Sequence, residues 1–274
     1  MRVVTFLAGG AIRHGVRTGD VIQVRPTAEA AVDIAMNEAA YQAGEEIAVA
    51  DVTLLAPVQR PGKVICIGLN YRAHAEEGGN PIPEYPAVFL RGPTSLVGPE
   101  GAIILPEISD KLDYEAELAV VIGKTATNVR DNPLEYVAGY CAFNDGSIRD
   151  FQRKSSQWTA GKNFDYSGAF SAELVTPDEL PAGASGLRIQ ARLNGEVMQD
   201  SNTADMIFDV ATLIVTLSQA MTLEPGDVIA TGTPAGVGYA RNPPVFMRAG
   251  DRIEVEIEGV GIAANTVARR GASL

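Results

Sequence analysis

Residues that build disulfides or soft-metal sites are scarce in this sequence. Its 274 residues include two cysteines and two histidines, too few for a zinc site made of several such ligands. Cys66 and Cys141 lie in the apolar segments KVICIG and GYCAFN, which is typical of reduced, buried thiols in a cytoplasmic protein. We therefore expect a cytoplasmic location, and we expect any bound metal to be a hard ion with oxygen ligands.

The chain also lacks an excess of basic residues and a long apolar run. Its net charge is −12, whereas a nucleic-acid-binding surface must be basic. No apolar run is long enough to cross a bilayer, and the first residues, MRVVTFLAGG, are typical of a strand rather than of a secretory signal. The sequence therefore predicts a protein that binds neither nucleic acid nor membranes. An anionic substrate would need a local positive site.

Prolines and glycines divide the chain into two parts. The segment LLAPVQRPGK, residues 54–63, interrupts any regular pattern and predicts a linker. Residues 1–58 are interpreted as a small N-terminal domain, with strands near 2–7 and 20–25 and a helix around 27–43. Residues 59–274 are interpreted as a second domain dominated by strands, which are expected at 63–67, 87–91, 114–122, 137–143, 187–193, 227–231 and 252–258.

One helix and one hairpin are expected in the second domain. Apolar side chains recur at helical spacing over residues 206–221, and Asp205 is the expected cap of that helix. The pair Asn194-Gly195 predicts a tight hairpin turn. The apolar stripe of the helix comprises Val210, Leu213, Ile214, Leu217 and Met221.

Two segments alternate acidic and apolar residues, but they predict different environments. In DRIEVEIEG, residues 251–259, one face is acidic and the other aliphatic, which is typical of a half-exposed antiparallel strand. In LDYEAELAVVI, residues 112–122, the acidic face continues into Ala119 and Val121, so Glu115 and Glu117 are expected to be buried on one face. Buried carboxylates need a compensating cation. The pair therefore either binds a divalent ion such as Mg²⁺ or Mn²⁺, or pairs with basic side chains.

Other segments supply candidate catalytic groups, although each taken singly also has a structural explanation. Asp145 ends an apolar strand and could add a third carboxylate, or could simply begin an Asp-Gly turn. His74 and Glu77 lie one helical turn apart, so Glu77 could raise the basicity of His74 for general-base catalysis. The glycines and prolines of residues 78–86 suggest a flap that closes over a ligand. The turn TGTPAGVG, residues 231–238, could hold a carboxylate through backbone amides and Thr233.

Seven segments together, and in order, resemble the fumarylacetoacetate hydrolase family over about residues 60–262. They are GLNYRAHAEE, PAVFLRGPTSLVGP, LDYEAELAVVIG, AGYCAFNDGSIRDFQ, GKNFD, LNGEVMQDSNTADMIF and LEPGDVIATGTPAGVG. Two departures are visible: Arg91-Gly92 stands where the family often has Lys-Pro, and SIRD stands in place of SARD. The first departure bears on the substrate rather than on the metal.

The resemblance implies a mixed α+β, β-rich fold with a catalytic domain of rolled mixed sheets, a small N-terminal domain and a homodimeric assembly. It implies one Mg²⁺ or Mn²⁺ per chain, bound by Glu115, Glu117 and Asp145. The implied catalytic residues are His74, Glu77 and Lys162, and the implied substrate contacts are Arg149, Thr233, Tyr71, Arg91 and Gln152.

The implied substrate is a small anionic 2-oxo acid. The expected reaction is metal-dependent hydrolysis of a carbon–carbon bond in an acylpyruvate or β-diketo acid of the kind met in aromatic catabolism, by water activated at His74 and with a stabilised enolate. Two alternatives begin from the same enolate: decarboxylation of a β-keto acid such as oxaloacetate, and isomerisation or hydration of an unsaturated 2-oxo diacid. The alternative outside catalysis is an oxo-acid-binding protein that retains the fold.

Overall fold

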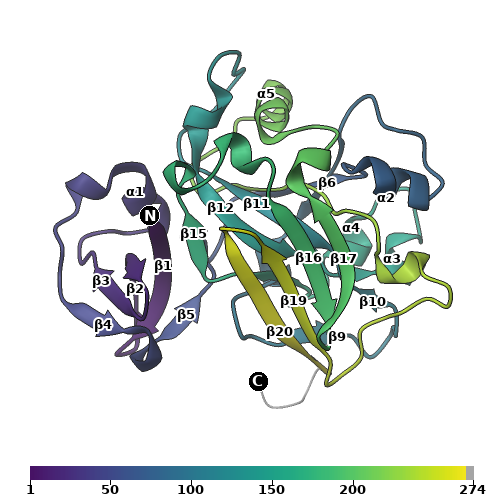
Figure 1. Cartoon of the computed structure of the whole chain (residues 1–274), viewed down its shortest axis with the longest axis horizontal. Coiled ribbons are helices and arrows are strands. Elements are labelled where there is room, and N and C mark those ends of the chain that lie inside the picture. Colours follow the sequence, from purple (N-terminus) through teal and green to yellow (C-terminus); the bar gives the residue numbers. More distant parts are fainter. Residues whose placement is uncertain (270–274) are drawn as a thin grey trace.

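A long β-sheet runs through the computed structural model, which describes residues 1–269 (Figure 1). Its main path has the strand order β4-β3-β2-β1-β15-β12-β11-β18-β6-β7. The strands are β1 (Arg2–Ala8), β2 (Ala11–Thr18), β3 (Val21–Val24), β4 (Glu46–Ala48), β6 (Val64–Gly68), β7 (Ala87–Arg91), β11 (Ala116–Ile122), β12 (Val137–Asn144), β15 (Glu173–Val175) and β18 (Val228–Ala230). Three short strands join beside this path: β5 (Thr53–Leu55), β8 (Leu96–Val97) and β14 (Gly168–Phe170).

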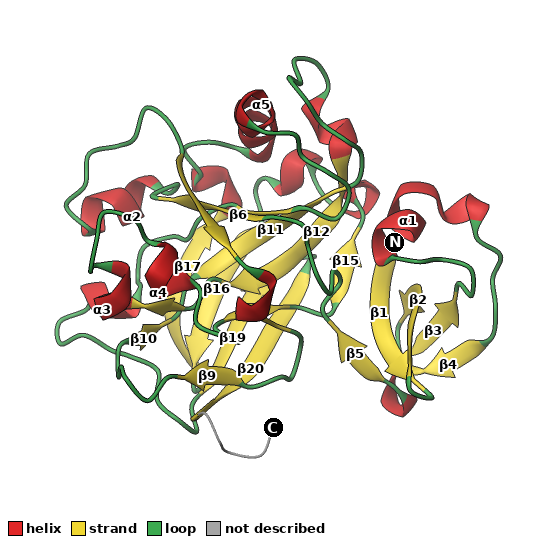
Figure 2. Ribbon diagram, turned by 180° about the vertical axis from the view of Figure 1, so that it is seen from behind, coloured by secondary structure: helices red, strands yellow, loops and turns green. Residues whose placement is uncertain are grey.

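A second sheet packs against the middle of the first, and short helices gather at one end of both sheets. Its order is β17-β16-β19-β20-β9, formed by Glu196–Asn202, Arg188–Leu193, Arg252–Ile257, Gly261–Arg269 and Ile103–Leu105. A small pair joins β10 (Leu112–Asp113) to β13 (Ser147–Ile148). Figures 1 and 2 both place α2 (Arg72–Glu77), α3 (Arg149–Gln152) and α4 (Thr159–Lys162) close together, away from α1 (Ala31–Asn37) and α5 (Val210–Ala220).

Strand β11 lies between β12 and β18 and is buried on both faces. One face puts Leu118 and Val120 into an apolar cluster with Val255 of β19, on the side of the second sheet. The other face puts Ala119 and Val121 into a second cluster that includes Ile34 of α1. Because a buried charge is costly, a strand that is buried on both faces can carry an acid only at an end that meets a polar cavity.

The acidic strand predicted to be half exposed behaves as expected. In β19, Ile253, Val255 and Ile257 are at most 1% exposed, whereas Glu254 and Glu256 are partly exposed and pair with Arg192 of β16. The two alternating segments therefore differ in the structure as they differ in the sequence.

The N-terminal strands continue the main sheet, because β1 pairs with β15 in antiparallel register. Within residues 1–58, β1 also pairs with β2 and β5. The division at residue 58 into a small and a large domain stays a prediction. Within residues 1–269, no helix has the length and hydropathy that a bilayer crossing requires.

The predicted fold class is confirmed, and so is the hairpin: β16 and β17 meet at Asn194 and Gly195, whose φ angles are +51° and +82°. The predicted strands did not include β2 or β20, nor several short strands such as β4, β9 and β15. Strand β2, with the sequence AIRHGVRT, shows no clean alternation of apolar and polar residues. It forms because it pairs with β1 on one side and β3 on the other. The expected helix over 27–43 is shorter, and α1 spans Ala31–Asn37.

The predicted cap of the second helix is wrong. Helix α5 begins at Val210, and the carboxylate of Asp209, not of Asp205, accepts a hydrogen bond from the backbone N–H of Thr212 at 2.8 Å. The chain is not helical over residues 206–209, because Met206 forms a β-bridge with Tyr71. Tertiary pairing thus overrides the helical periodicity at this end.

The Asp209→Ala variant is expected to lose about 1 kcal/mol of unfolding free energy, because an unpaired N-terminal amide of α5 would replace a capped one. Asp205→Ala is the matched control and is expected to lose much less. Urea denaturation of both variants measures the difference. Equal losses would show that Asp209 does not act as the cap.

Candidate active site

Three acidic side chains converge where β11 begins and β12 ends. The strands are antiparallel, with Ala116 opposite Asn144, and the backbone N–H of Asp145 donates to the carbonyl of Glu115 at 2.9 Å. Glu115, Glu117 and Asp145 are at most 5% exposed. One carboxylate oxygen of each lies within 4.8 Å of the others. We call these residues the carboxylate triad.

Three cationic side chains contact Glu115 and Asp145 and offset part of the negative charge of the triad. The ammonium Nζ of Lys162 contacts both Glu115 and Asp145. Arg149 Nη1 lies 2.6 Å from Glu115, and Arg91 Nη1 lies 2.6 Å from Asp145. Glu115 therefore pairs with basic side chains, which is one of the two outcomes that the sequence left open. The oxygens of the three acids are also close enough together to hold an ion.

The charges shift one another's titration strongly. Burial disfavours the Glu115 carboxylate, but Arg149 and Lys162 outweigh burial and lower the pKa of Glu115 to about 2. Burial raises the pKa of Glu117 well above its ordinary value, and the charges of Asp145 and Glu115 raise it further. Burial opposes the charge on Lys162, yet Asp145 and Glu115 outweigh it and raise the pKa of the ammonium. When no ion is bound, Glu117 is therefore protonated more readily than Glu115.

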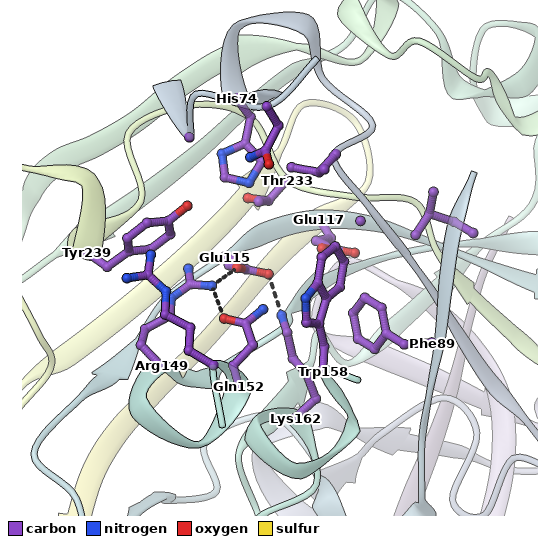
Figure 3. Close-up of a pocket in the computed structure, with 16 residues that line it drawn as sticks. His74, Phe89, Glu115, Glu117, Arg149, Gln152, Trp158, Lys162, Thr233 and Tyr239 are labelled. Carbon is purple, nitrogen blue, oxygen red and sulfur yellow. Dashed lines mark hydrogen bonds and ion pairs between the residues drawn. The ribbon is translucent and has the colours of Figure 1, made fainter. Parts of the chain in front are cut away.

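Two acids of the triad, Glu115 and Glu117, line a cavity of about 240 Å³, whereas Asp145 is fully buried beside it. Figure 3 shows Lys162 and Arg149 reaching Glu115 from α4 and α3. The predicted residues His74, Thr233 and Gln152 also line the cavity. The walls further include Phe89, Trp158 and Tyr239, which the sequence reasoning did not single out.

His74 and Glu77 meet as their spacing predicted, since Nδ1 of His74 lies 3.4 Å from Oε2 of Glu77. Glu77 also accepts a hydrogen bond from the backbone N–H of Gly236 at 3.0 Å, which ties α2 to the loop 231–238. The N–H of Gly232 in the same loop donates to Glu117 at 3.0 Å. These two amides thus bind protein carboxylates rather than lying free for a substrate.

Two predicted substrate contacts lie outside this cavity. Tyr71 lines a neighbouring hollow, and its side chain is buried under the bridge to Met206. Arg91 extends beneath the triad, where its guanidinium contacts Asp145. The end of β7 turns this side chain inward, so Arg91 supports a predicted metal ligand instead of facing a substrate.

Two polar residues that the sequence reasoning missed connect the parts of the site. Asp113 accepts hydrogen bonds from the backbone N–H groups of Gly238 and Tyr239 and from Nε of Arg149, at 2.8–3.0 Å. The amide oxygen of Gln199 accepts from the N–H of Ala116 at 2.9 Å. Both are buried polar residues in strands, but this is a weak signal without their partners.

Gln199 also orients Thr233. Its amide nitrogen donates to Oγ1 of Thr233 and to the carbonyl of Pro234, both at 2.8 Å. Because the threonine oxygen accepts this bond, its own O–H is directed elsewhere. Thr233 lines the cavity, so its hydroxyl can donate to a ligand oxygen there.

Residues 63–268 match the family model for the C-terminal domain of fumarylacetoacetate (FAA) hydrolase, and residues 1–57 match that for the N-terminal domain of Rv2993c-like proteins. The chain belongs to the fumarylacetoacetate hydrolase family. The resemblance carried by the seven segments is thereby confirmed, and with it the assignment to an enzyme family.

Relatives within the fumarylacetoacetate hydrolase family carry several names. The Rattus norvegicus protein named oxaloacetate tautomerase Fahd2a, mitochondrial, is 46% identical over 218 residues, which cover 79% of this chain and 69% of the relative. The crystal structure of 5-carboxymethyl-2-hydroxymuconate delta-isomerase from Mycobacterium smegmatis has a TM-score of 0.84 at 33% identity, covering 98% of this chain and 100% of that one. A fumarylacetoacetate hydrolase from Exiguobacterium antarcticum has a TM-score of 0.84 at 34% identity, with the same coverage.

The carboxylate triad fits the divalent ion expected for the family. Carboxylate oxygens are the ligands that Mg²⁺ and Mn²⁺ prefer, and the raised pKa of Glu117 is the mark of a buried acid that lacks sufficient positive charge. A bound cation would supply that charge. The identity of the ion is not fixed by the triad alone.

Ion binding to the triad is expected to release a proton, because an ion requires the ionised form of Glu117. Apparent Mn²⁺ affinity should therefore rise about tenfold per pH unit until the pH exceeds the pKa of Glu117. Folding raises the pKa of Glu117, so the free energy of unfolding of the metal-free protein should fall as the pH rises through that pKa. Added Mn²⁺ should restore the lost stability. Calorimetric titrations in two buffers with different ionisation enthalpies count the protons.

The Glu117→Gln variant is the control for this measurement, since its amide does not titrate. It should bind Mn²⁺ more weakly and release no proton at this position. Binding without proton release in the unmodified protein would contradict the assignment.

Proposed function

We propose that this chain catalyses proton-transfer isomerisation of a small 2-oxo dicarboxylate, of which keto–enol tautomerisation of oxaloacetate is the simplest case. The observation that carries the proposal is that an anion-binding group, Arg149, lines the same small cavity as Glu115 and Glu117 of the carboxylate triad. Arg149 lines the cavity and is buried, and its Nη2 has no hydrogen-bond partner among residues 1–269. A substrate carboxylate would supply that partner.

The size of the cavity and the relatives support a short diacid. Its volume of about 240 Å³ lies below the roughly 300–1,000 Å³ of sites for drug-sized ligands. The relative at 46% identity is named as an oxaloacetate tautomerase, and a structural neighbour is named as an isomerase. Both names describe movement of a proton and a double bond, without addition of water.

The residues of the site can be given roles in such a reaction. Glu115, Glu117 and Asp145 would hold a divalent ion, which would supply Lewis-acid polarisation of the 2-oxo group. Arg149 and the hydroxyl of Thr233 bind the carboxylates of the substrate, and Gln152, which accepts a hydrogen bond from Arg149 at 3.0 Å, orients the guanidinium.

His74 is the proposed proton carrier. Because Glu77 lies against Nδ1, the other ring nitrogen, Nε2, is the one available to the substrate. Nε2 removes a proton from the carbon beside the 2-oxo group, and the Lys162 ammonium stabilises the charge that develops on oxygen. Delivery of the same proton to that oxygen gives the enol, and the reverse steps regenerate the ketone.

Carbon–carbon hydrolysis is the second candidate, and the His74–Glu77 pair favours it because the same base could activate water. A neighbour at 34% identity is named as a fumarylacetoacetate hydrolase. Decarboxylation of oxaloacetate needs no water and shares the enolate, so it is a third outcome at the same site.

The His74→Ala variant should lose roughly 10²–10⁴-fold of the oxaloacetate tautomerisation rate, the usual contribution of a general base. His14→Ala is the matched control, because His14 is the other histidine of the chain and lies in β2. Absorbance of the enol follows the rate in Mn²⁺ with and without EDTA, and released pyruvate reports decarboxylation.

The same preparations should be offered acylpyruvates. Faster cleavage of an acylpyruvate than tautomerisation of oxaloacetate would favour hydrolysis, and an undiminished rate in His74→Ala would remove His74 from the mechanism. A protein that binds Mn²⁺ but turns over neither class would favour the oxo-acid-binding alternative.

The Gln199→Glu variant tests the direction of the Thr233 hydroxyl. A carboxylate at this position would accept the threonine proton, and the oxygen lone pairs would then face the anionic substrate. We expect KM to rise about tenfold, in line with the loss of one hydrogen bond to a charged group, with kcat nearly unchanged. An unchanged KM in a folded variant would contradict the role assigned to Thr233.

We also propose a homodimer in the cytoplasm. Both cysteines are free and buried, as expected for a reducing compartment. Val88 and Leu90 are 39% and 46% exposed on β7, which ends the main path of the sheet. An edge strand with exposed aliphatic side chains is suited to contact a second copy, and light scattering would measure the assembly.

A further inference from the structure

Each acid of the carboxylate triad has one oxygen engaged by a protein donor that is not Lys162. Arg149 Nη1 lies 2.6 Å from Oε1 of Glu115, and the N–H of Gly232 lies 3.0 Å from Oε2 of Glu117. Arg91 Nη1 lies 2.6 Å from Oδ1 of Asp145. The second oxygens of Glu115 and Asp145 contact the ammonium of Lys162, so a bound ion would have to replace the ammonium there.

Arg91 is the most completely fixed of these donors. Its side chain is 0% exposed. Nε donates to Oγ of Ser95 at 3.3 Å. Nη1 donates to Asp145 and to the carbonyl of Gly146, the latter at 3.1 Å. Nη2 donates to Oγ of Ser167 at 2.6 Å and to the carbonyl of Ser95 at 3.5 Å. All five N–H groups of a guanidinium are thus engaged.

The surroundings leave room for a planar guanidinium. A Cβ atom added at Gly168 would lie 2.6 Å from Nη2 of Arg91, so only glycine fits there without displacing the side chain. A lysine has three donors on one nitrogen and cannot reach these acceptors together. Arg91 does not line the cavity, so its fixed partner is Asp145 and not the substrate.

We propose that Arg91 is a positioning residue that makes the metal site selective for Mg²⁺ and Mn²⁺ over Ca²⁺. By holding Oδ1, Arg91 restricts Asp145 to binding an ion through one oxygen. Mg²⁺ and Mn²⁺ take six oxygen ligands in octahedral geometry, whereas Ca²⁺ takes up to eight and readily accepts both oxygens of a carboxylate. An Asp145 free to rotate would favour the larger ion.

Calorimetric titration of the metal-free protein with MnCl₂, MgCl₂ and CaCl₂ tests this inference without any substrate. In Arg91→Lys, which keeps the positive charge, the ratio of the Ca²⁺ Kd to the Mn²⁺ Kd should fall about tenfold or more, the size of effect typical when a residue that orients a ligand is changed. Arg25→Lys is the matched control, because Arg25 is a buried arginine paired with Glu38 away from the site. Its ratio should equal that of the unmodified protein.

A folded Arg91→Lys protein with an unchanged ratio would overturn the proposal, as would equal weakening for all three ions. Ser167→Ala provides a second test that does not depend on the folding of Arg91→Lys. This substitution removes one hydrogen-bond acceptor of the Arg91 guanidinium and leaves Asp145 in place. The ratio of the Ca²⁺ Kd to the Mn²⁺ Kd should therefore fall by a smaller factor than in Arg91→Lys. An unchanged ratio would count against the proposal. An unmodified protein that prefers Mn²⁺ over Ca²⁺ but does not turn over the substrate would instead contradict the proposed function alone.

Discussion

Compensation of buried negative charge is the interaction on which the rest of this structure depends. Glu115, Glu117 and Asp145 are held almost out of contact with water, where an uncompensated carboxylate would cost several kcal/mol. Arg91, Arg149 and Lys162 supply positive charge from three different elements. The strands and short helices that carry these cations are thereby brought to one place, and the cavity forms where they meet.

This arrangement also explains how an acidic protein can bind an acidic ligand. The net charge is −12, yet the cavity contains Lys162 and Arg149, and its triad is suited to a divalent ion. Attraction would be local because a ligand in the cavity would lie beside Lys162 and Arg149, whereas the surface charge is screened by water and salt. Asp113 and Gln199 join the metal-binding strand to the loop 231–238, so ion and substrate sites are held in a common frame.

The choice among hydrolysis, decarboxylation and isomerisation depends on events after the shared enolate. Spacing suggested the His74–Glu77 pair as a general base, and the family resemblance led to the hydrolytic interpretation, since such a base can activate water. The same nitrogen can equally carry a proton between carbon and oxygen. The similarity to a protein named as a tautomerase favours this second use, and the short cavity is compatible with it.

The sequence by itself determined the family, through seven segments in order, and the local features: the β-rich class, the hairpin at Asn194-Gly195, and the contrast between an acidic strand that is buried and one that is half exposed. The local features follow from residue order, because side-chain alternation and turn preference act over a few residues. Tertiary structure decided that α5 is capped by Asp209, that Arg91 lies beneath Asp145, and that Gln199 orients Thr233. Each of these depends on the packing of distant segments: Gln199 and Thr233 are 34 residues apart, and Arg91 and Asp145 are 54 apart. The direction in which a buried side chain turns is set by neighbours that residue order alone does not reveal.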